Sequence, residues 1–311
     1  PPLQIPPGRR PPPGRAGRGI PRTGSRRVLT LGDPGDCAVF IRKTTTTDAF
    51  VAVDLGDVPG HGVVRLAPKI LQGGAKDLAR SVTYALASLE RRETGVSAGV
   101  NSTPDGRDAA IAAFAAEVAG WDAGYRLTAG KGVAAGELGD LETPSNAVLL
   151  ATGAVAAGLA ACPDAGTAVV DGSAGPALLD ELTRHGLSLV EAEDPLTATA
   201  DLLFVGSGVG AIDHVAADRL QVRVMVPTGP LPITTRAVAH CRRNGVLALP
   251  DFVTTAGPLV GEADAVRDTV STIIGDVLGH GDGPLLGACE RAEAFMAGWL
   301  TDLPFGRPMA A

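Results

Sequence analysis

The sequence predicts an α/β fold of two domains, the second a reduced, Rossmann-like doubly wound domain. Short apolar strands alternate with segments whose apolar residues recur at helical spacing, as a parallel sheet requires. The strand Thr167–Val170 runs into a glycine-rich turn and then a helix, the unit from which doubly wound sheets are built. The length of 311 residues is enough for two hydrophobic cores.

The first half of the chain predicts strands and helices in turn. We expect strands at 37–41, 50–55 and 96–100, with a helix at 76–91 between the last two. A further helix should follow Pro104, with Asp105 as its N-cap. The apolar stripes of the two helices are Leu78, Val82, Ala85, Leu86 and Leu89 in the first, and Ile111, Phe114, Ala115 and Val118 in the second.

The second half begins with an uncharged stretch at 147–163, for which Ser145 is the expected cap. It is rich in Ala and Gly and shorter than the roughly 20 strongly apolar residues of a membrane span, so it predicts a buried helix. The remaining expected strands lie at 188–192, 202–205 and 223–226, and the remaining helices at 177–185, 262–278 and 287–301.

The N-terminal residues 1–27 differ from the rest in composition, with eight prolines, seven arginines and no acid. Such a segment cannot bury enough apolar surface to fold, and we expect disorder through residue 36. It is either a polyproline or RNA-binding arm or an extension with no role, and we favour the extension. The rest of the chain carries a net charge of −14, which argues against nucleic-acid binding.

The chain shows no apolar signal segment and no metal-binding spacing among its five histidines. Its four cysteines, Cys37, Cys162, Cys241 and Cys289, are far apart and form no C-x-x-C pair. We expect reduced, packed thiols in a cytoplasmic protein without a metal or a membrane segment.

The candidate phosphate loop follows the strand Thr167–Val170. Ala174 stands where a dinucleotide loop has its second glycine, and Asp171 would place an acid beside the phosphates. The eight residues 194–201 are too few for the helix and strand of a full nucleotide-binding half. The turn is therefore either a degenerate NAD or NADP site or a structural βαβ turn, and we favour the structural turn. The candidate cofactor-binding residues are Gly172, Ser173, Ala174, Gly175 and Glu193.

Lysine is scarce, with four residues against 23 arginines. Arginine keeps its proton near neutral pH, so it cannot act as an acid, a base or an imine-forming amine. Any lysine chemistry must use Lys43, Lys69, Lys76 or Lys131. Lys131 is the candidate of interest because it follows a strand in a glycine-bracketed loop, although a solvated loop lysine is the simpler interpretation.

Five segments together resemble the glutamate/leucine/phenylalanine/valine dehydrogenases, leucine dehydrogenase in particular. LARSVTYALA at 78–87 is similar to that family's L-A-x-x-M-T-Y-K-N-A, and GVSAGV at 95–100 to G-G-K-A-x-I. TAGKGV at 128–133 is similar to T-A-E-D-V-G, and NGVLALPDFVTTAGPLV at 244–260 to G-I-x-x-x-P-D-Y-V-x-N-(S/A)-G-G-V-I. With 203–212, the resemblance covers about residues 48–300.

The resemblance implies a substrate domain of the amino-acid dehydrogenase type at 37–143 plus about 277–311, and a nucleotide domain at 144–276. It also implies homo-oligomers, and the NAD- or NADP-dependent oxidative deamination of an amino acid to a 2-oxo acid. In the family one lysine holds the substrate carboxylate, a second activates water, and an aspartate relays protons around one substrate.

This sequence departs from the family at each of those three positions, which are occupied by Ala85, Ser97 and Lys131. Thr255 replaces a family asparagine, and the segment 226–230 lacks another. We therefore expect a non-catalytic relative that binds a small amino-acid-like ligand or stabilises an oligomer, either with itself or with an active paralogue. The alternatives are an enzyme with altered chemistry that uses Lys131, and an active dehydrogenase.

Overall fold

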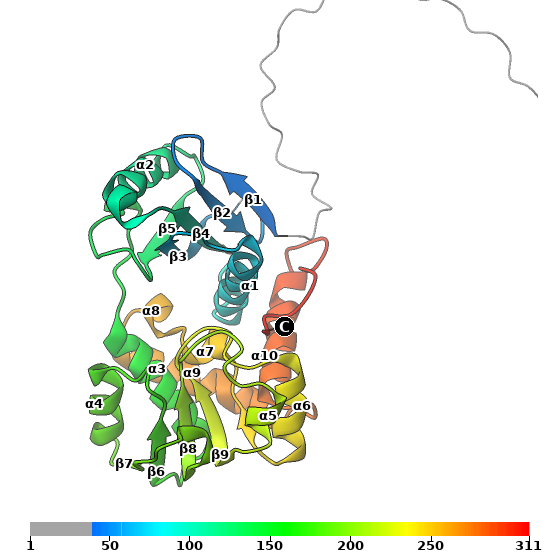
Figure 1. The fold of residues 1–311 in the computed structure, drawn as a ribbon. Helices are drawn as coiled ribbons and strands as arrows, with labels where there is room; N and C mark the ends of the chain where they lie inside the picture. Colours follow the sequence, from blue (N-terminus) through cyan, green and yellow to red (C-terminus); the bar gives the residue numbers. More distant parts are fainter. Residues whose placement is uncertain (1–38, 57, 311) are drawn as a thin grey trace, which may run out of the picture. The chain divides into compact units, whose positions relative to one another are not determined.

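Two five-stranded sheets, one after the other along the chain, organise the structure, which is a computed structural model (Figure 1). It describes residues 39–56 and 58–310. The expected disorder of residues 1–36 and the expected packing of Cys37 lie outside the described residues. The two-domain α/β prediction is confirmed at the level of the fold, while the boundaries at 143/144 and 276/277 remain predictions.

The first sheet has the strand order β1-β2-β4-β3-β5. β2 is antiparallel to β1 and β4, whereas β3 is parallel to β4 and β5. Its strands are β1 (Phe40–Lys43), β2 (Ala49–Val53), β3 (Gly60–Ala67), β4 (Thr94–Asn101) and β5 (Tyr125–Ala129).

Strand β3 was not expected from the sequence, because glycines at 60 and 62 interrupt its apolar pattern. The structure requires one of them: a Cβ on Gly62 would lie 1.7 Å from the Val96 carbonyl oxygen. Close approach of two strand backbones therefore selects glycine inside this strand.

One helix covers each face of the first sheet. α2 (Arg107–Ala119) buries Ile111, Phe114 and Val118 in a cluster with alternate residues of β2 and β4. α1 (Gln72–Ser88) packs on the opposite face, where Ala75 and Ala79 meet β2. The alternation of side chains along each strand thus separates an α2 face from an α1 face.

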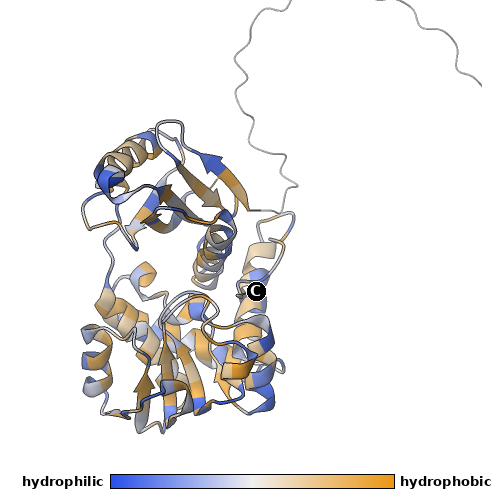
Figure 2. Ribbon diagram, in the orientation of Figure 1, coloured by the Kyte–Doolittle hydropathy of each residue, from blue (hydrophilic) through white to orange (hydrophobic). Residues whose placement is uncertain are grey.

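The second sheet is wholly parallel, with the order β10-β9-β8-β6-β7. Its strands are β6 (Thr167–Val170), β7 (Ser188–Leu189), β8 (Thr199–Val205), β9 (Gln221–Pro227) and β10 (Leu247–Ala248). This is the doubly wound order with the third strand missing, as the shortness of 194–201 predicted. Its strands are largely apolar in Figure 2, as expected for a sheet buried on both faces.

The helices of this half are α3 (Ala147–Ala161), α4 (Pro176–Arg184), α5 (His214–Ala217), α6 (Thr235–Arg243), α7 (Asp251–Thr254), α8 (Gly257–Val260), α9 (Ala263–Leu278) and α10 (Pro284–Ala297). α3 is the expected buried helix, and among the described residues no helix is long and apolar enough to cross a membrane.

Two predicted caps are wrong. Asn146, not Ser145, caps α3 by accepting a bond from the Leu149 amide. Asp105 lies in a short 3₁₀ turn, Pro104–Gly106, and α2 begins after it without a side-chain cap. In both places the helix begins one or two residues later than the sequence pattern indicated, so the neighbouring residue takes the cap position.

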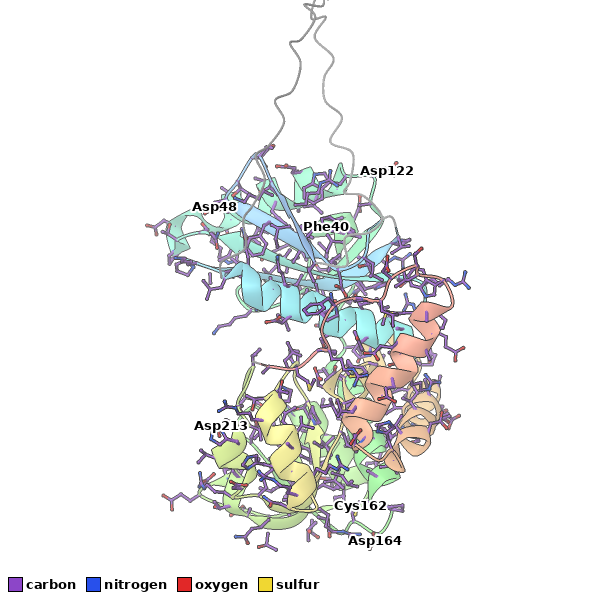
Figure 3. All side chains as sticks on the ribbon, turned by 90° about the vertical axis from the view of Figure 1, so that its right-hand side faces the viewer. Phe40, Asp48, Asp122, Cys162, Asp164 and Asp213 are labelled. Atoms are coloured by element: carbon purple, nitrogen blue, oxygen red, sulfur yellow. The ribbon has the colours of Figure 1, made fainter. Side chains whose placement is uncertain are left out.

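Helix α1 belongs to both halves of the described chain. It packs on β4 of the first sheet and also on α7 and α10, and Figure 3 shows it beside α10. Its residues Tyr84, Ala85 and Ala87 join the large core cluster of the second sheet. The free cysteines Cys162, Cys241 and Cys289 are buried, as expected for packed thiols.

Candidate functional site

The carboxyl ends of β6 and β8 meet where the strand order of the second sheet reverses. Ligands of doubly wound sheets bind at this point, because the loops diverge there and leave backbone amides available. Three segments lie at this edge: the turn after β6, the loop that begins at Gly206 after β8, and Thr228 after β9.

The Asp171 carboxylate bridges these loops. Its Oδ2 accepts hydrogen bonds from the amides of Gly206 at 2.8 Å and Ser207 at 2.9 Å. Its Oδ1 accepts from the Ser173 amide at 3.0 Å and from the Ser173 hydroxyl. Burial alone would raise the pKa of Asp171, but these bonds outweigh it and hold the pKa below its usual value. The carboxylate is therefore an internal anion that occupies three backbone amides of this edge.

The space around Gly206 is also filled. A Cβ on Gly206 would lie 2.5 Å from the Thr228 hydroxyl oxygen and 2.7 Å from that of Ser173. The loops after β6, β8 and β9, which are neighbours in the sheet, thus lie close together at this edge. A pyrophosphate at this edge would face the Asp171 carboxylate and compete for amides that are already bonded, so the arrangement does not fit it.

The other residues of the predicted loop are placed differently. Added Cβ atoms on Gly172 and Gly175 would meet nothing within 4 Å, so packing does not require glycine at either position. Ala174 is partly buried against the core. Glu193 is exposed in a bend beyond β7, a strand of two residues that ends well before the predicted residue 192.

The three positions singled out by the family resemblance have different surroundings. Ala85 is 6% exposed and lies in the core cluster shared with the second sheet. Ser97, in the middle of β4, is fully buried, and its hydroxyl has no hydrogen-bond partner. Lys131 is exposed in a turn after β5, where its carbonyl oxygen accepts from the Leu66 amide. Among the described residues, these positions do not form one accessible group of side chains.

A carboxylate that the sequence did not single out joins the two halves. Asp251 follows β10, and its Oδ2 accepts from the Leu231 amide at 2.8 Å and the Ser81 hydroxyl of α1 at 3.2 Å. Complete burial raises its pKa to about 6, in spite of these bonds. The sequence identifies Pro250-Asp251-Phe252 only as part of the segment that resembles the dehydrogenase family. The contact of Asp251 with α1 is a tertiary feature that the sequence does not reveal.

A second unpredicted contact involves Arg80 of α1. Its guanidinium pairs with Asp54, at 2.7 Å from Nη2 to Oδ1, and both side chains are almost wholly buried. It also donates to the carbonyl oxygens of Phe305 and Gly306, in the segment that follows α10. That segment then runs on to Ala310, which bonds to Ile233 and Thr235 beside α6.

The described cavities lie elsewhere. One of about 490 Å³ is open to solvent where the end of α1 meets α8 and α9, and none of the predicted site residues lines it. Within residues 39–56 and 58–310 no three His, Cys, Asp or Glu side chains are grouped as a metal site. The expectation that no metal is bound was made from the sequence and stays a prediction.

The strand order and the bridged loops define a doubly wound domain preceded by a mixed α/β sheet, and amino-acid dehydrogenases are among the solved structures with a similar fold. L-tryptophan dehydrogenase from Nostoc punctiforme has a TM-score of 0.65 at 17% identity, with 84% of this chain and 96% of that chain covered. The leucine-bound, hetero-hexameric glutamate dehydrogenase from Thermus thermophilus also gives 0.65 at 17%, covering 79% and 84%.

Glutamate dehydrogenase from Plasmodium falciparum has a TM-score of 0.62 at 14% identity, covering 80% of this chain and 79% of that one. No protein-family model and no curated protein sequence matches the chain. The chain therefore has the fold of amino-acid dehydrogenases, and at these identities the likeness establishes the fold alone.

Proposed function

We propose that this chain is a non-catalytic relative of the amino-acid dehydrogenases, resembling a divergent leucine dehydrogenase, that serves as a binding or oligomer-stabilising subunit. The observation that carries the proposal is the set Ala85, Ser97 and Lys131. The first two have no group that titrates near neutral pH, and the third is a cation where the family has a carboxylate. The groups of such a set act as a unit, and loss of one acid or base alone commonly costs 10²–10⁴-fold in rate.

The other lysines offer no substitute. A lysine becomes a base near neutral pH when it is buried or crowded by other cations. None of the chain's four lysines is buried in the structure. The alternative of altered chemistry on Lys131 would require a partner or ligand to enclose that exposed side chain.

The Asp171 bridge supports the cofactor part of the proposal. The resemblance implies NAD or NADP, but the Ser173 amide of the candidate phosphate loop is already bonded to the Asp171 carboxylate, and that carboxylate would repel a phosphate. We therefore expect NADH to bind more weakly than about 1 mM, or roughly −4 kcal/mol. Saturable, tighter binding by calorimetry would contradict this.

A partner subunit is part of the proposal. The Thermus thermophilus glutamate dehydrogenase with this fold is hetero-hexameric and was solved with leucine bound. By analogy, this chain would form homo-oligomers or hetero-oligomers with an active paralogue and would bind a small amino-acid-like ligand. We also propose a cytoplasmic location, which the free, buried cysteines support.

The test is 2-oxo-acid-dependent NADH oxidation by the full chain, alone and co-expressed with a dehydrogenase paralogue from the same genome. We expect no turnover alone, and co-purification with the paralogue or a defined homo-oligomer by light scattering. Turnover by the chain alone would overturn the proposal. Turnover that is lost in Lys131→Ala but kept in Lys43→Ala would favour altered chemistry instead.

Restoring the family's groups gives a stricter test. The triple variant Ala85→Lys, Ser97→Lys, Lys131→Asp should remain inactive, because the cofactor edge is blocked independently and two lysines would enter buried positions. Folding of the variant is checked by circular dichroism. Robust turnover by a folded triple variant would show that the nucleotide edge is open.

A further inference from the structure

His61 of β3 lies within a group of charged side chains on the first sheet. In the register of the strands it is opposite Gly95 of β4 and Arg126 of β5. Arg91 and Glu93 lie in the segment that joins α1 to β4. The side chain of His61 is 13% exposed, against 24% for Glu93 and 30% for Arg91. The histidine is therefore the most enclosed member of this trio.

One ring nitrogen of His61 contacts both a cation and an anion. Its Nε2 lies 2.9 Å from Nη2 of Arg91 and 3.1 Å from Oε2 of Glu93. A guanidinium only donates hydrogen bonds, and a carboxylate only accepts them. The neutral ring, with its proton on Nδ1, accepts from Arg91. The protonated ring instead donates to Glu93 and turns a positive charge towards Arg91, so one nitrogen cannot satisfy both neighbours at once.

Arg91 connects this trio to the second half of the molecule. Its Nη2 also bonds to Glu93 at 2.5 Å, while its Nη1 donates to the Leu259 carbonyl oxygen of α8 at 3.2 Å. Both nitrogens belong to one rigid, planar guanidinium, so a displacement at His61 also displaces the group at Leu259. Arg91 and Leu259 both line the open cavity of about 490 Å³, which leaves the guanidinium room to move.

The charges around His61 decide how readily it takes up a proton. Burial and the positive charges of Arg91 and Arg126 lower its pKa, and they outweigh Glu93, which raises it. The adjoining elements β4 and α8 contain no charged residue. Because Arg91 opposes protonation, His61 binds a proton more tightly in any arrangement in which Arg91 has moved away. Proton uptake must then favour that arrangement.

We propose that His61, Arg91 and Glu93 form a proton-operated latch between β3 and α8. With neutral His61 the latch is closed, and Arg91 bridges the ring to the Leu259 carbonyl oxygen. Protonated His61 bonds to Glu93 and repels Arg91, whose guanidinium moves into the cavity and leaves Leu259. The latch does not depend on whether the chain is catalytic or oligomeric.

The test is hydrogen exchange of the full chain at about pH 7.5 and about pH 5.5, on either side of the ordinary histidine pKa, corrected for the intrinsic rate at each pH. The closed latch lowers the pKa of His61, so its effect is complete above about pH 6.5 and is lost as the pH falls through the lowered value. The amides of Leu259 and Gly261, which bond to carbonyl oxygens of the same turn, report on α8. Their protection should fall about 3- to 10-fold at the lower pH.

Two variants separate the parts of the latch. His61→Gln keeps an acceptor for Arg91 but takes up no proton, so α8 should be equally protected at both pH values. Arg91→Met removes the bond to Leu259, so protection should be low at both; it also covers the case in which His61→Gln does not fold. The matched control is His185→Gln, at the end of α4, where burial also lowers the pKa of the histidine. It should keep the pH dependence of the wild type.

Helix α2, which packs on the other face of the first sheet, is the internal reference and should keep its protection. The proposal is overturned if α8 of the wild type stays protected at the lower pH, or if α2 loses as much protection as α8. It is also overturned if His61→Gln remains pH-dependent, if His185→Gln does not, or if Arg91→Met is protected like the wild type. Asp251 titrates in the same range, but its raised pKa means that protonation stabilises the folded state and cannot mimic the expected loss.

Discussion

Replacing Asp171 by Asn tests whether the carboxylate holds the edge of the second sheet together. The carboxylate accepts through both oxygens, whereas an amide has one acceptor and one NH₂ group. In one orientation the NH₂ group of Asn points at the amides of Gly206 and Ser207, and in the other it points at the amide and hydroxyl of Ser173. In either case two donors face another donor. Two charge-assisted bonds are lost either way. At about 1.5 kcal/mol each, the free energy of unfolding should fall by about 3 kcal/mol.

The assay is urea unfolding followed by circular dichroism at pH 7, with Asp180→Asn, an exposed position on α4, as the control. Because the pKa of Asp171 is lowered by folding, its contribution is complete above its unfolded value of about 4 and is lost as the pH falls through the folded value. The gap between wild type and Asp171→Asn should therefore narrow in acid. A loss below about 1 kcal/mol, or one equal to that of the control, would refute the reasoning.

Three other outcomes follow from contacts described above. Burial raises the pKa of Asp251 to about 6, so the free energy of unfolding should fall by up to ~3 kcal/mol as the pH rises from about 4 to 6. Urea unfolding at each pH should show this slope in the wild type and not in Asp251→Asn. Arg80→Met leaves Asp54 buried without its counter-charge and should cost about 3–5 kcal/mol by the same measurement; a loss under 1 kcal/mol would contradict the pairing. A Cβ on Gly95 would lie 1.9 Å from an α1 carbonyl oxygen, so Gly95→Ala should lower stability by about 3 kcal/mol. Gly73→Ala, open on the same helix, should instead raise it by about 0.5–1 kcal/mol, and equal effects of the two would refute the close approach.

Much of the fold could be predicted because local patterns and tertiary packing agree. The strand Thr167–Val170 and the helices α9 and α10 match their predicted positions within a few residues, since β-branched or periodic apolar runs decide them. β3 could not be predicted because its glycines interrupt the apolar pattern, and Gly62 is required by the close approach of β4 rather than by β3 itself. The predicted starts of α2 and α3 are one or two residues too early, so the cap of α3 is Asn146 and not the predicted Ser145.

The candidate site was predictable only as a set of positions. Sequence comparison could identify Ala85 and Ser97 as departures from a family pattern, but not that both are buried. From the sequence, Asp171 could be identified only as an acid that does not suit a phosphate loop. Its bonds to Gly206 and Ser207 arise because β6 and β8 are neighbours in the sheet, although the residues are about 35 positions apart in the sequence. The buried Nε and Nη2 atoms of Arg65 have no hydrogen-bond partner, which could not be predicted because one arginine among 23 has no local signature.

The contact between Arg80 and the segment after α10 bears on how the protein is made. Arg80 and the carbonyl oxygen of Phe305 are 225 positions apart. At the usual pace of about 5–20 residues per second, a ribosome needs roughly 10–45 s to pass from one to the other. Until then the guanidinium has only Asp54 to bond, and α1 lacks the α10 surface it packs against. The first sheet can therefore be complete while α1 still lacks its contacts with α10, and during that interval a chaperone could shield the α1 surface that α10 later covers.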